Sequence, residues 1–239
     1  MIAIQTTSLT KKFRNKTAVD SLNLSIEQGE LFSLLGVNGA GKTTTIKMLT
    51  CLIKPTEGDA AILGSSIVSE PQTVKKKISV SPQETAVARN LSVKENLELV
   101  AKIFGFDKKA ADAKVEEMIE TFRLKEVSNS KAATLSGGMQ RRLSIAMALI
   151  SDPQILFLDE PTLGLDVISR RELWTTIEKL KGKVTVILTT HYMEEAEALS
   201  DRIGIMAEGK LKSVGTVPQL LANTNAKTLE EAFVQLVKS

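Results

Sequence analysis

The sequence is poor in the residues that build metal cages and disulfide scaffolds. Its 239 residues include one cysteine (Cys51), one histidine (His191), one tryptophan (Trp174) and one tyrosine (Tyr192). A single cysteine excludes an intramolecular disulfide and a cysteine-based zinc site, and is typical of a reducing compartment. A single histidine excludes a histidine-rich metal site. Any chemistry must therefore depend on glycine, lysine, carboxylate and hydroxyl groups.

The chain also lacks a strong charge bias and long apolar runs. Its 31 basic and 28 acidic residues leave a net charge of +3, too small to favour nucleic acid as a direct partner. Apolar runs such as 31–37 are far shorter than the roughly 20 residues that cross a bilayer. The N-terminal sequence MIAIQTTSLTKKF lacks the basic and apolar regions of a signal peptide. We therefore expect a cytosolic protein that reaches a membrane only by docking on a membrane protein.

Short apolar runs alternate with helical stretches, which indicates an α/β fold with a mainly parallel sheet. Residues 31–35, 155–158 and 184–188 are almost entirely apolar, as is typical of central strands covered on both faces. Residues 21–27 alternate between polar and apolar, which predicts one half-buried strand. Helical spacing and start signals predict helices over residues 42–51, 92–104, 107–122 and 138–150.

The predicted helices cluster in the middle of the chain. Residues 85–150 have almost no strand signal, so we expect one domain over 1–239 in which a helical subdomain (85–150) is inserted into an α/β core (1–84 and 151–239). The helix over 92–104 opens with Ser92 and Glu95, the spacing of a capping box. The helix over 138–150 carries an apolar face formed by Met139, Leu143, Ala146, Met147 and Ile150.

A phosphate-binding loop follows the first apolar strand. Residues 36–43, GVNGAGKT, match G-x-x-x-x-G-K-[ST] between a strand and a helix, which is the context that the motif requires. Its glycines let successive backbone N–H groups point into one concavity, and the helix N-terminus adds a positive end. Lys42 would reach the β- and γ-phosphates, and the Thr43 hydroxyl would bind magnesium. The dinucleotide pattern G-x-G-x-x-G is absent, which disfavours a Rossmann dehydrogenase.

Two acidic residues end a second apolar strand. In the sequence ILFLDE, Asp159 and Glu160 follow directly on residues 155–158. A central strand delivers such side chains to the carboxyl edge of the sheet, where open α/β folds bind ligands. Asp159 can help to hold magnesium there, while Glu160 can polarise a water for attack on the γ-phosphate.

The order of the motifs resembles the ATPase domain of ABC transporters. The resemblance rests on GVNGAGKT, Gln83 after the strand at 78–81, the run LSGGMQ at 135–140, LFLDEPT, the run at 164–166 and His191. It covers nearly the whole chain. It implies a P-loop, RecA-like core with a mainly parallel sheet, an N-terminal antiparallel β region and an inserted helical subdomain that carries LSGGMQ.

The resemblance also implies a set of site residues for ATP and Mg²⁺. Glu160 and His191 would act on the attacking water and the γ-phosphate with Lys42, and the adenine would stack on Phe13, a position where this family more often has tyrosine. Magnesium would be held by Thr43, Gln83 and Asp159. The nucleotide contacts from this chain would also include Gly36, Asn38, Gly39, Ala40, Gly41 and Thr44.

The same resemblance implies partners. Ser136, Gly137 and Gly138 would bind the nucleotide of a second ATPase subunit across a head-to-tail dimer, and Asp166 would couple the two sites. A membrane permease would dock near Gln83 and the helical subdomain, which would hold the protein at the inner face of the membrane. The segment from residue 215 to 233 resembles exporter-type drug and lipid ATPases. An import ATPase, a translation or repair factor and a regulatory subunit without hydrolysis remain alternatives.

Overall fold

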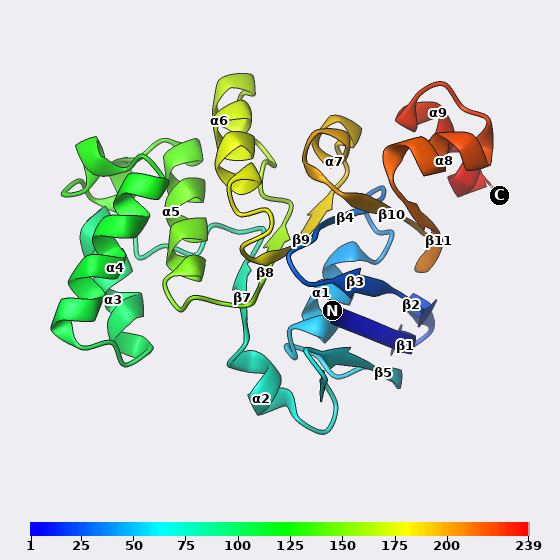
Figure 1. Ribbon diagram of the computed structural model, residues 1–239, viewed down its shortest axis with the longest axis horizontal. Coiled ribbons are helices and arrows are strands. Elements are labelled where there is room, and N and C mark those ends of the chain that lie inside the picture. Colours follow the sequence, from blue (N-terminus) through cyan, green and yellow to red (C-terminus); the bar gives the residue numbers. More distant parts are fainter. Residues whose placement is uncertain (239) are drawn as a thin grey trace.

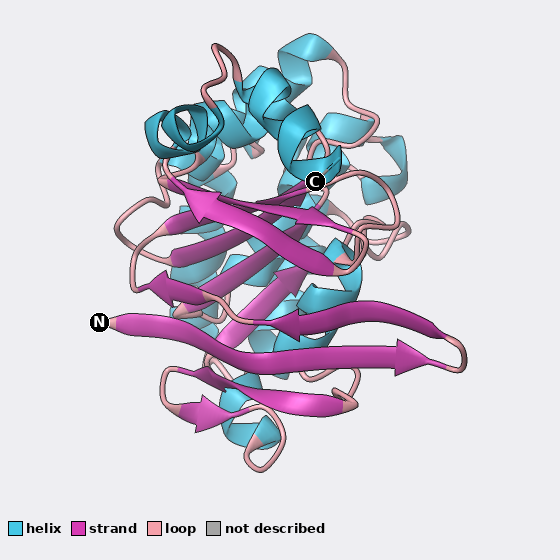
Figure 2. Cartoon of the chain, turned by 90° about the vertical axis from the view of Figure 1, so that its right-hand side faces the viewer, coloured by secondary structure: helices cyan, strands magenta, loops and turns pink. Residues whose placement is uncertain are grey.

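The computed structural model describes residues 1–238 and contains two β-sheets (Figures 1 and 2). The larger sheet has the order β11-β10-β4-β9-β8-β7, and only its β10–β11 pair is antiparallel. This sheet confirms the predicted α/β fold. Its strands are β4 (Leu31–Leu35), β7 (Ile78–Ser81), β8 (Ile155–Asp159), β9 (Thr185–Thr190), β10 (Arg202–Ala207) and β11 (Lys210–Gly215).

The smaller sheet is antiparallel and comes from the N-terminal part of the chain, as expected. Its order is β2-β1-β5-β6, and β3 pairs with β1 as well. Figure 2 shows the long β1 and β2 crossing the molecule beside the larger sheet. The strands are β1 (Ile2–Phe13), β2 (Lys16–Leu22), β3 (Ser25–Glu27), β5 (Glu57–Ile62) and β6 (Ser65–Ser66).

The prediction of one strand over residues 21–27 is wrong, because the chain breaks between β2 and β3. Ser21 has a φ of 49°, in the left-handed region. The Asn23 side chain donates to Ser21 O (2.9 Å) and accepts from Ser8 N (2.8 Å). An asparagine side chain that takes backbone partners in this way competes with the strand ladder.

The four predicted helices are present, with ends that differ by no more than two residues: α1 (Lys42–Leu49), α3 (Val93–Ile103), α4 (Lys108–Thr121) and α5 (Gly137–Leu149). The capping box is confirmed, because Ser92 Oγ accepts from Glu95 N and Glu95 Oε2 accepts from Ser92 N. The other helices are α2 (Pro71–Lys75), α6 (Val167–Glu178), α7 (Met193–Leu199), α8 (Val217–Thr224) and α9 (Leu229–Lys238), with 3₁₀ turns at Lys125–Val127 and Ala132–Thr134.

The apolar strands are buried on both faces, as their composition predicts. On β8, Ile155 and Phe157 join the core that packs against α1 and the antiparallel sheet. Leu156 and Leu158 alternate with them and join the core shared with the helices of residues 85–150. Side chains of a strand point to opposite faces in turn, so a strand that is apolar at every position can serve two cores.

Helices α3, α4 and α5 lie together at one end of the molecule, away from α8 and α9 (Figure 1). Their apolar core continues into one face of the larger sheet. The division of the chain at residues 84 and 150 stays a prediction. Within residues 1–238, no helix has both the length and the apolar character that spanning a bilayer requires.

Helix α5 is buried more widely than its predicted apolar face. Leu143, Ala146 and Ile150 are buried as expected, whereas Met139 and Met147 are only partly buried. Arg141, Ser144, Ile145 and Ala148 are buried as well. The reason is that α5 packs against α3, α4 and α6 and against strands β7 and β8, which cover several of its sides.

Candidate functional site

The loop between β4 and α1 is packed so closely that two of its glycines have no room for a side chain. A Cβ atom on Gly36 would lie 2.4 Å from Met206 O, and one on Gly41 would lie 2.4 Å from Ala18 O. Gly41 also has a φ of 107°, which L-residues with side chains rarely adopt. The backbone can therefore wrap tightly at the N-terminus of α1, where a helix favours an anion.

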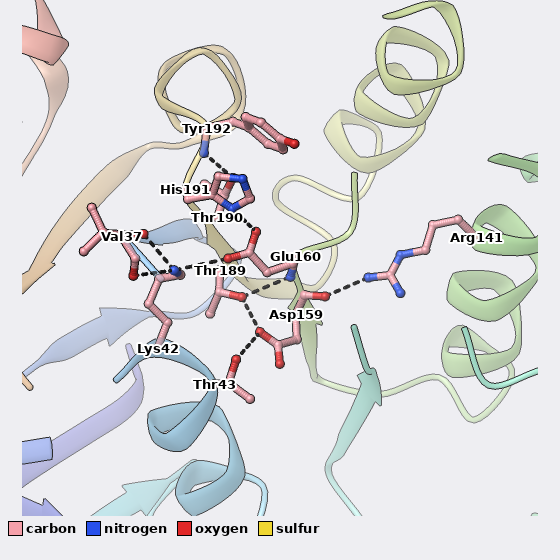
Figure 3. Close-up of polar contacts among 11 residues, drawn as sticks. Val37, Lys42, Thr43, Arg141, Asp159, Glu160, Thr189, Thr190, His191 and Tyr192 are labelled. Carbon is pink, nitrogen blue, oxygen red and sulfur yellow. Dashed lines mark hydrogen bonds and ion pairs between the residues drawn. The ribbon is translucent and has the colours of Figure 1, made fainter. Parts of the chain in front are cut away.

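Lys42 lies folded over this loop (Figure 3). Its Nζ donates to Gly36 O (2.7 Å) and Val37 O (3.2 Å), and it lies 3.2 Å from Oε1 of Glu160. Both charged side chains are buried, with 5% and 7% exposed. The Lys42 ammonium group is therefore held at the loop that follows β4. A cation in this place is well positioned to contact a phosphate bound by the backbone N–H groups of the loop.

Asp159 collects hydroxyl groups from two neighbouring elements. Its Oδ1 accepts from Thr43 Oγ1 (3.1 Å), at the start of α1, and from Thr189 Oγ1 (2.5 Å), on β9 (Figure 3). Hydroxyl and carboxylate oxygens are ligands that Mg²⁺ prefers, and Mg²⁺ sites often use one or two carboxylates together with phosphate oxygens. The chemistry of this oxygen set therefore fits magnesium bound together with a phosphate.

Glu160 leaves the end of β8 in a strained backbone conformation. Its φ of 47° lies in the left-handed region, and its N–H is held by Thr189 O (3.1 Å). Oε2 of Glu160 lies 2.7 Å from Nδ1 of His191, which follows β9 (Figure 3). Backbone strain of this kind persists at functional sites where the surroundings hold it. The turn brings the carboxylate between Lys42 and His191.

Ten of the predicted site residues line one cavity of about 470 Å³. Phe13, at the end of β1, lies on its wall with half of its surface exposed and with Lys11 Nζ 5.2 Å from the centre of its ring, so an exposed part of the ring is available to stack on a planar ligand. Sequence reasoning missed Lys16, Ala18 and Leu163, which share this wall and belong to no motif. The predicted residues at the cavity are Phe13, Asn38, Gly39, Gly41, Lys42, Thr43, Thr44, Gln83, Glu160 and His191.

Other predicted residues lie away from this cavity wall. Ser136 caps α5, where its Oγ accepts from Met139 N (3.3 Å), and a Cβ on Gly138 would lie 2.9 Å from the Ser169 side chain. Ser136 and Gly137 are exposed. Asp166 caps α6, and hydrogen bonds from Ser169 and Ile168 lower its pKa. Gly36 N donates to Thr190 O (3.2 Å), Ala40 O accepts from Gly209 N (3.0 Å), and Asp159 contacts the cavity residue Thr43.

Arg141 of α5 is a site-supporting residue that the sequence did not reveal. It donates to the carbonyls of Pro82 and Pro161 and to Asp159 O (2.9 Å), and it is 3% exposed. Burial lowers its pKa to about 10, so it remains charged at neutral pH. The Arg141 guanidinium thus links the backbone just before Gln83 to the backbone on both sides of Glu160. In the sequence, Arg141 appears only as one of two adjacent arginines, a pattern that is typical of the polar face of a helix.

We expect Arg141→Lys to destabilise the fold by about 2 kcal/mol, because lysine cannot satisfy three separated carbonyls with one planar fork. The matched control is Arg142→Lys, which changes the next residue in the same way. Among the residues that the structure describes, Arg142 pairs only with the partly exposed Glu172 (3.3 Å), so its substitution should cost less than about 1 kcal/mol. Urea unfolding of both variants measures the difference. Equal midpoints for the two variants would contradict this role of Arg141.

The chain is similar to known proteins both in sequence and in structure. The family model described as "ABC transporter" matches residues 19–163. The chain is 40% identical to the probable multidrug ABC transporter ATP-binding protein YbhF of Escherichia coli, covering 98% of this chain and 41% of that protein. It is 40% identical to the daunorubicin/doxorubicin resistance ATP-binding protein DrrA of Streptomyces peucetius, covering 95% of this chain and 69% of that one. The chain thus spans about two fifths of YbhF.

Two solved structures share the fold along nearly their whole lengths. One is an ATP-binding subunit of an ABC transporter, with a TM-score of 0.86 and 27% identity, covering 98% of this chain and 99% of that chain. The other is a dimeric ATP-binding cassette in a post-hydrolysis state with ADP and phosphate, with a TM-score of 0.80 and 28% identity. The match covers 89% of this chain and 98% of the chain in that structure.

Proposed function

Because the chain belongs to the ABC transporter family, as one of its ATPases, we propose that it binds ATP with Mg²⁺ in the cavity described above and uses hydrolysis to drive transport through a membrane permease. The observation that carries this proposal is the convergence of Phe13, Lys42, Gln83, Glu160 and His191 on one cavity. These residues come from five separate parts of the sequence, and each has the chemistry that one part of an ATP complex needs.

Each part of the nucleotide has a partner on the cavity wall. The adenine stacks on Phe13, a contact worth roughly 1–3 kcal/mol per base in nucleic-acid sites. The phosphates lie against the loop from Gly36 to Thr44, where N–H groups and the start of α1 favour an anion. Lys42 would exchange its pairing with the loop carbonyls and Glu160 for contacts with the β- and γ-phosphates. Magnesium, held by Thr43, Asp159 and Gln83, would neutralise charge that develops on the phosphates.

Glu160 and His191 carry the reaction. Glu160 orients the attacking water and accepts a proton from it, because its carboxylate lies at the cavity wall while Asp159 is engaged with hydroxyls. His191 holds the Glu160 carboxylate and faces the same cavity, where it would position the water and the γ-phosphate. The two side chains meet only because β8 and β9 are neighbours in the sheet.

A second copy of the ATPase subunit, or a related one, completes each site. Ser136 and Gly137 are exposed at the start of α5 and are not part of this chain's own cavity wall. In this proposal, Ser136, Gly137 and Gly138 bind the γ-phosphate held by the partner, and Asp166 lies near the dimer contact. The exposed apolar side chains of Val167 and Ile168, next to Asp166, support a contact there.

Complementation between two inactive variants tests the shared site. Ser136→Arg blocks the half of the site that this chain offers its partner, and Glu160→Gln removes the base of its own half. We expect each variant alone to be inactive and an equal mixture, combined before ATP is added, to recover up to about a quarter of the normal ATPase rate, because random pairing places one intact site in half of the dimers. Steady-state phosphate release measures the recovery. A mixture that stays as inactive as its components would contradict a shared site.

Transport requires a membrane partner, and we propose that a permease docks near Gln83 and the helical subdomain and holds the chain at the inner face of the membrane. The direction proposed is export, supported by the drug-resistance relatives and by the segment 215–233. Reconstitution with the permease that co-purifies with the chain tests this step. When ATP is added outside the vesicles, the ATPase side faces outward, so ATP-dependent uptake of a dye into the vesicles supports export and ATP-dependent loss of dye from loaded vesicles contradicts it.

A further inference from the structure

The tyrosine next to the catalytic histidine packs directly against it. The rings of His191 and Tyr192 have their centres 4.1 Å apart at an angle of 39°. Figure 3 shows the Tyr192 ring on the side of His191 opposite Glu160. The Tyr192 hydroxyl forms no hydrogen bond within residues 1–238. The ring, rather than the hydroxyl, therefore makes the contact that restrains the imidazole.

Arg170 of α6 links this ring to the only tryptophan. Its guanidinium lies 5.6 Å from the centre of the Tyr192 ring and 5.6 Å from that of the Trp174 ring. Cations at this distance from an aromatic face are attracted by it, and more strongly where water is excluded. The Nε of Arg170 is buried and has no hydrogen-bond partner in the described part of the chain. The arginine is therefore held mainly by the two rings and by a weak pairing with Glu194 (3.8 Å).

Trp174 is fixed in turn by a buried carboxyl group. Its indole Nε1 donates to Oε1 of Glu195 on α7 (3.0 Å), and the Glu195 side chain is fully buried. The other oxygen, Oε2, has no partner among residues 1–238. Burial raises the pKa of Glu195, although the Thr190, Thr162 and Trp174 groups that face it act in the opposite direction. The Trp174–Glu195 hydrogen bond therefore joins α6 to α7, the helix that follows His191 directly.

We propose that Tyr192, Arg170 and Trp174 form a positioning stack that ties His191 to helix α6. This inference rests on the proposed function, in which His191 acts on the γ-phosphate and Asp166 lies near the dimer contact. Because Asp166 caps the start of α6, a partner subunit that touches this start would set the direction of the imidazole through the stack. The stack thereby links formation of the dimer to the Glu160–His191 contact, and none of its three residues contacts the nucleotide.

Removing the Tyr192 ring tests the stack. We expect Tyr192→Ala to lower kcat for ATP hydrolysis by about tenfold, because a small misplacement of a catalytic group slows the chemical step. The KM for ATP should stay within about twofold, because the residue does not touch the nucleotide. Tyr192→Phe keeps the ring and should restore the normal kcat. A Tyr192→Phe variant as slow as Tyr192→Ala, or a Tyr192→Ala variant with normal kcat, would overturn the proposal.

A double-variant cycle separates the stack from simple loss of stability. Arg170→Ala should lower kcat by a similar factor, and the double variant with Tyr192→Ala should be no slower than either single variant, because both break one stack. Two losses that multiply would mean that the residues act independently, and would overturn the proposal. Emission from Trp174, the only tryptophan in the sequence, reports whether the indole is buried and should stay typical of a buried indole in Tyr192→Ala. A shift to the emission of an exposed indole would instead assign the lost activity to local unfolding.

The ATPase activity of the unaltered chain shows whether a failed test contradicts the proposed function or only the positioning stack. If it fails to bind and hydrolyse Mg-ATP, the proposed function itself is wrong. If it hydrolyses ATP and the Tyr192 and Arg170 variants match it in kcat, the proposed function stands and the positioning stack is wrong.

Discussion

Replacement of Glu160 by glutamine is expected to lower kcat for ATP hydrolysis by about 1,000-fold, the size of contribution that general bases make. Glutamine has the shape of the carboxylate and can keep its place beside His191 (2.7 Å). It cannot accept the proton from the attacking water. The substitution removes the carboxylate charge beside Lys42 and leaves the hydrogen bonds of Lys42 to Gly36 O and Val37 O in place. Lys42 therefore stays at the loop and available to the phosphates.

The same variant should therefore bind ATP and hold the dimer together. Gel filtration in the presence of Mg-ATP is expected to show a stable dimer for Glu160→Gln, because the nucleotide that joins the two chains is not consumed. Glu197→Gln, an exposed position on α7, is the matched control and should keep normal activity. If Glu160→Gln hydrolysed ATP at a rate within a few-fold of normal, another group would have to serve as the base.

Replacement of Lys42 by alanine has the second largest expected effect, on binding rather than on the chemical step. The affinity for Mg-ATP should fall by about 100-fold, or ~3 kcal/mol, because a charge-assisted contact with phosphate is lost in a largely buried site. The variant also leaves the buried carboxylate of Glu160 without its cation, 3.2 Å away in the intact chain. Titration with a fluorescent ATP analogue measures the loss of affinity.

Lys47→Ala is the matched control for this prediction. Lys47 lies on the same helix but is exposed. The Lys47→Ala substitution therefore changes the net charge by the same amount and leaves the contacts of the loop intact. Its affinity for Mg-ATP should remain within about twofold of normal, because an exposed charge is screened by solvent and salt. If the two variants bound ATP equally well, the role of Lys42 in phosphate binding would be refuted.

The residues that short motifs predicted are those whose position depends on local structure. GVNGAGKT specifies its own strand, turn and helix, and the structure adds that Gly36 and Gly41 are closely covered by Met206 and Ala18. Asp159 and Glu160 follow from an apolar strand that runs to the sheet edge. By contrast, nothing near residue 21 in the sequence showed that Asn23 would take backbone partners from two strands and break the predicted strand.

Residues that act at a distance could not be identified from the sequence. Arg141 appears there as one of two adjacent arginines, and only the packing of α5 against β7 and β8 shows that it holds three backbone carbonyls. Trp174 and Tyr192 appear as two isolated aromatic residues. Their link through Arg170 exists because α6 and α7 pack side by side.

The sequence by itself determined the α/β class, the phosphate loop, the acidic pair and the histidine, because each depends on neighbours in the chain and on the alternation of strands and helices. The scarcity of histidine and cysteine already limited the chemistry to glycine, lysine, carboxylate and hydroxyl groups, with His191 as the exception. Only the tertiary structure decided that Glu160 would lie between Lys42 and His191. That contact depends on the order β4-β9-β8, in which strands far apart in the sequence become neighbours through parallel pairing.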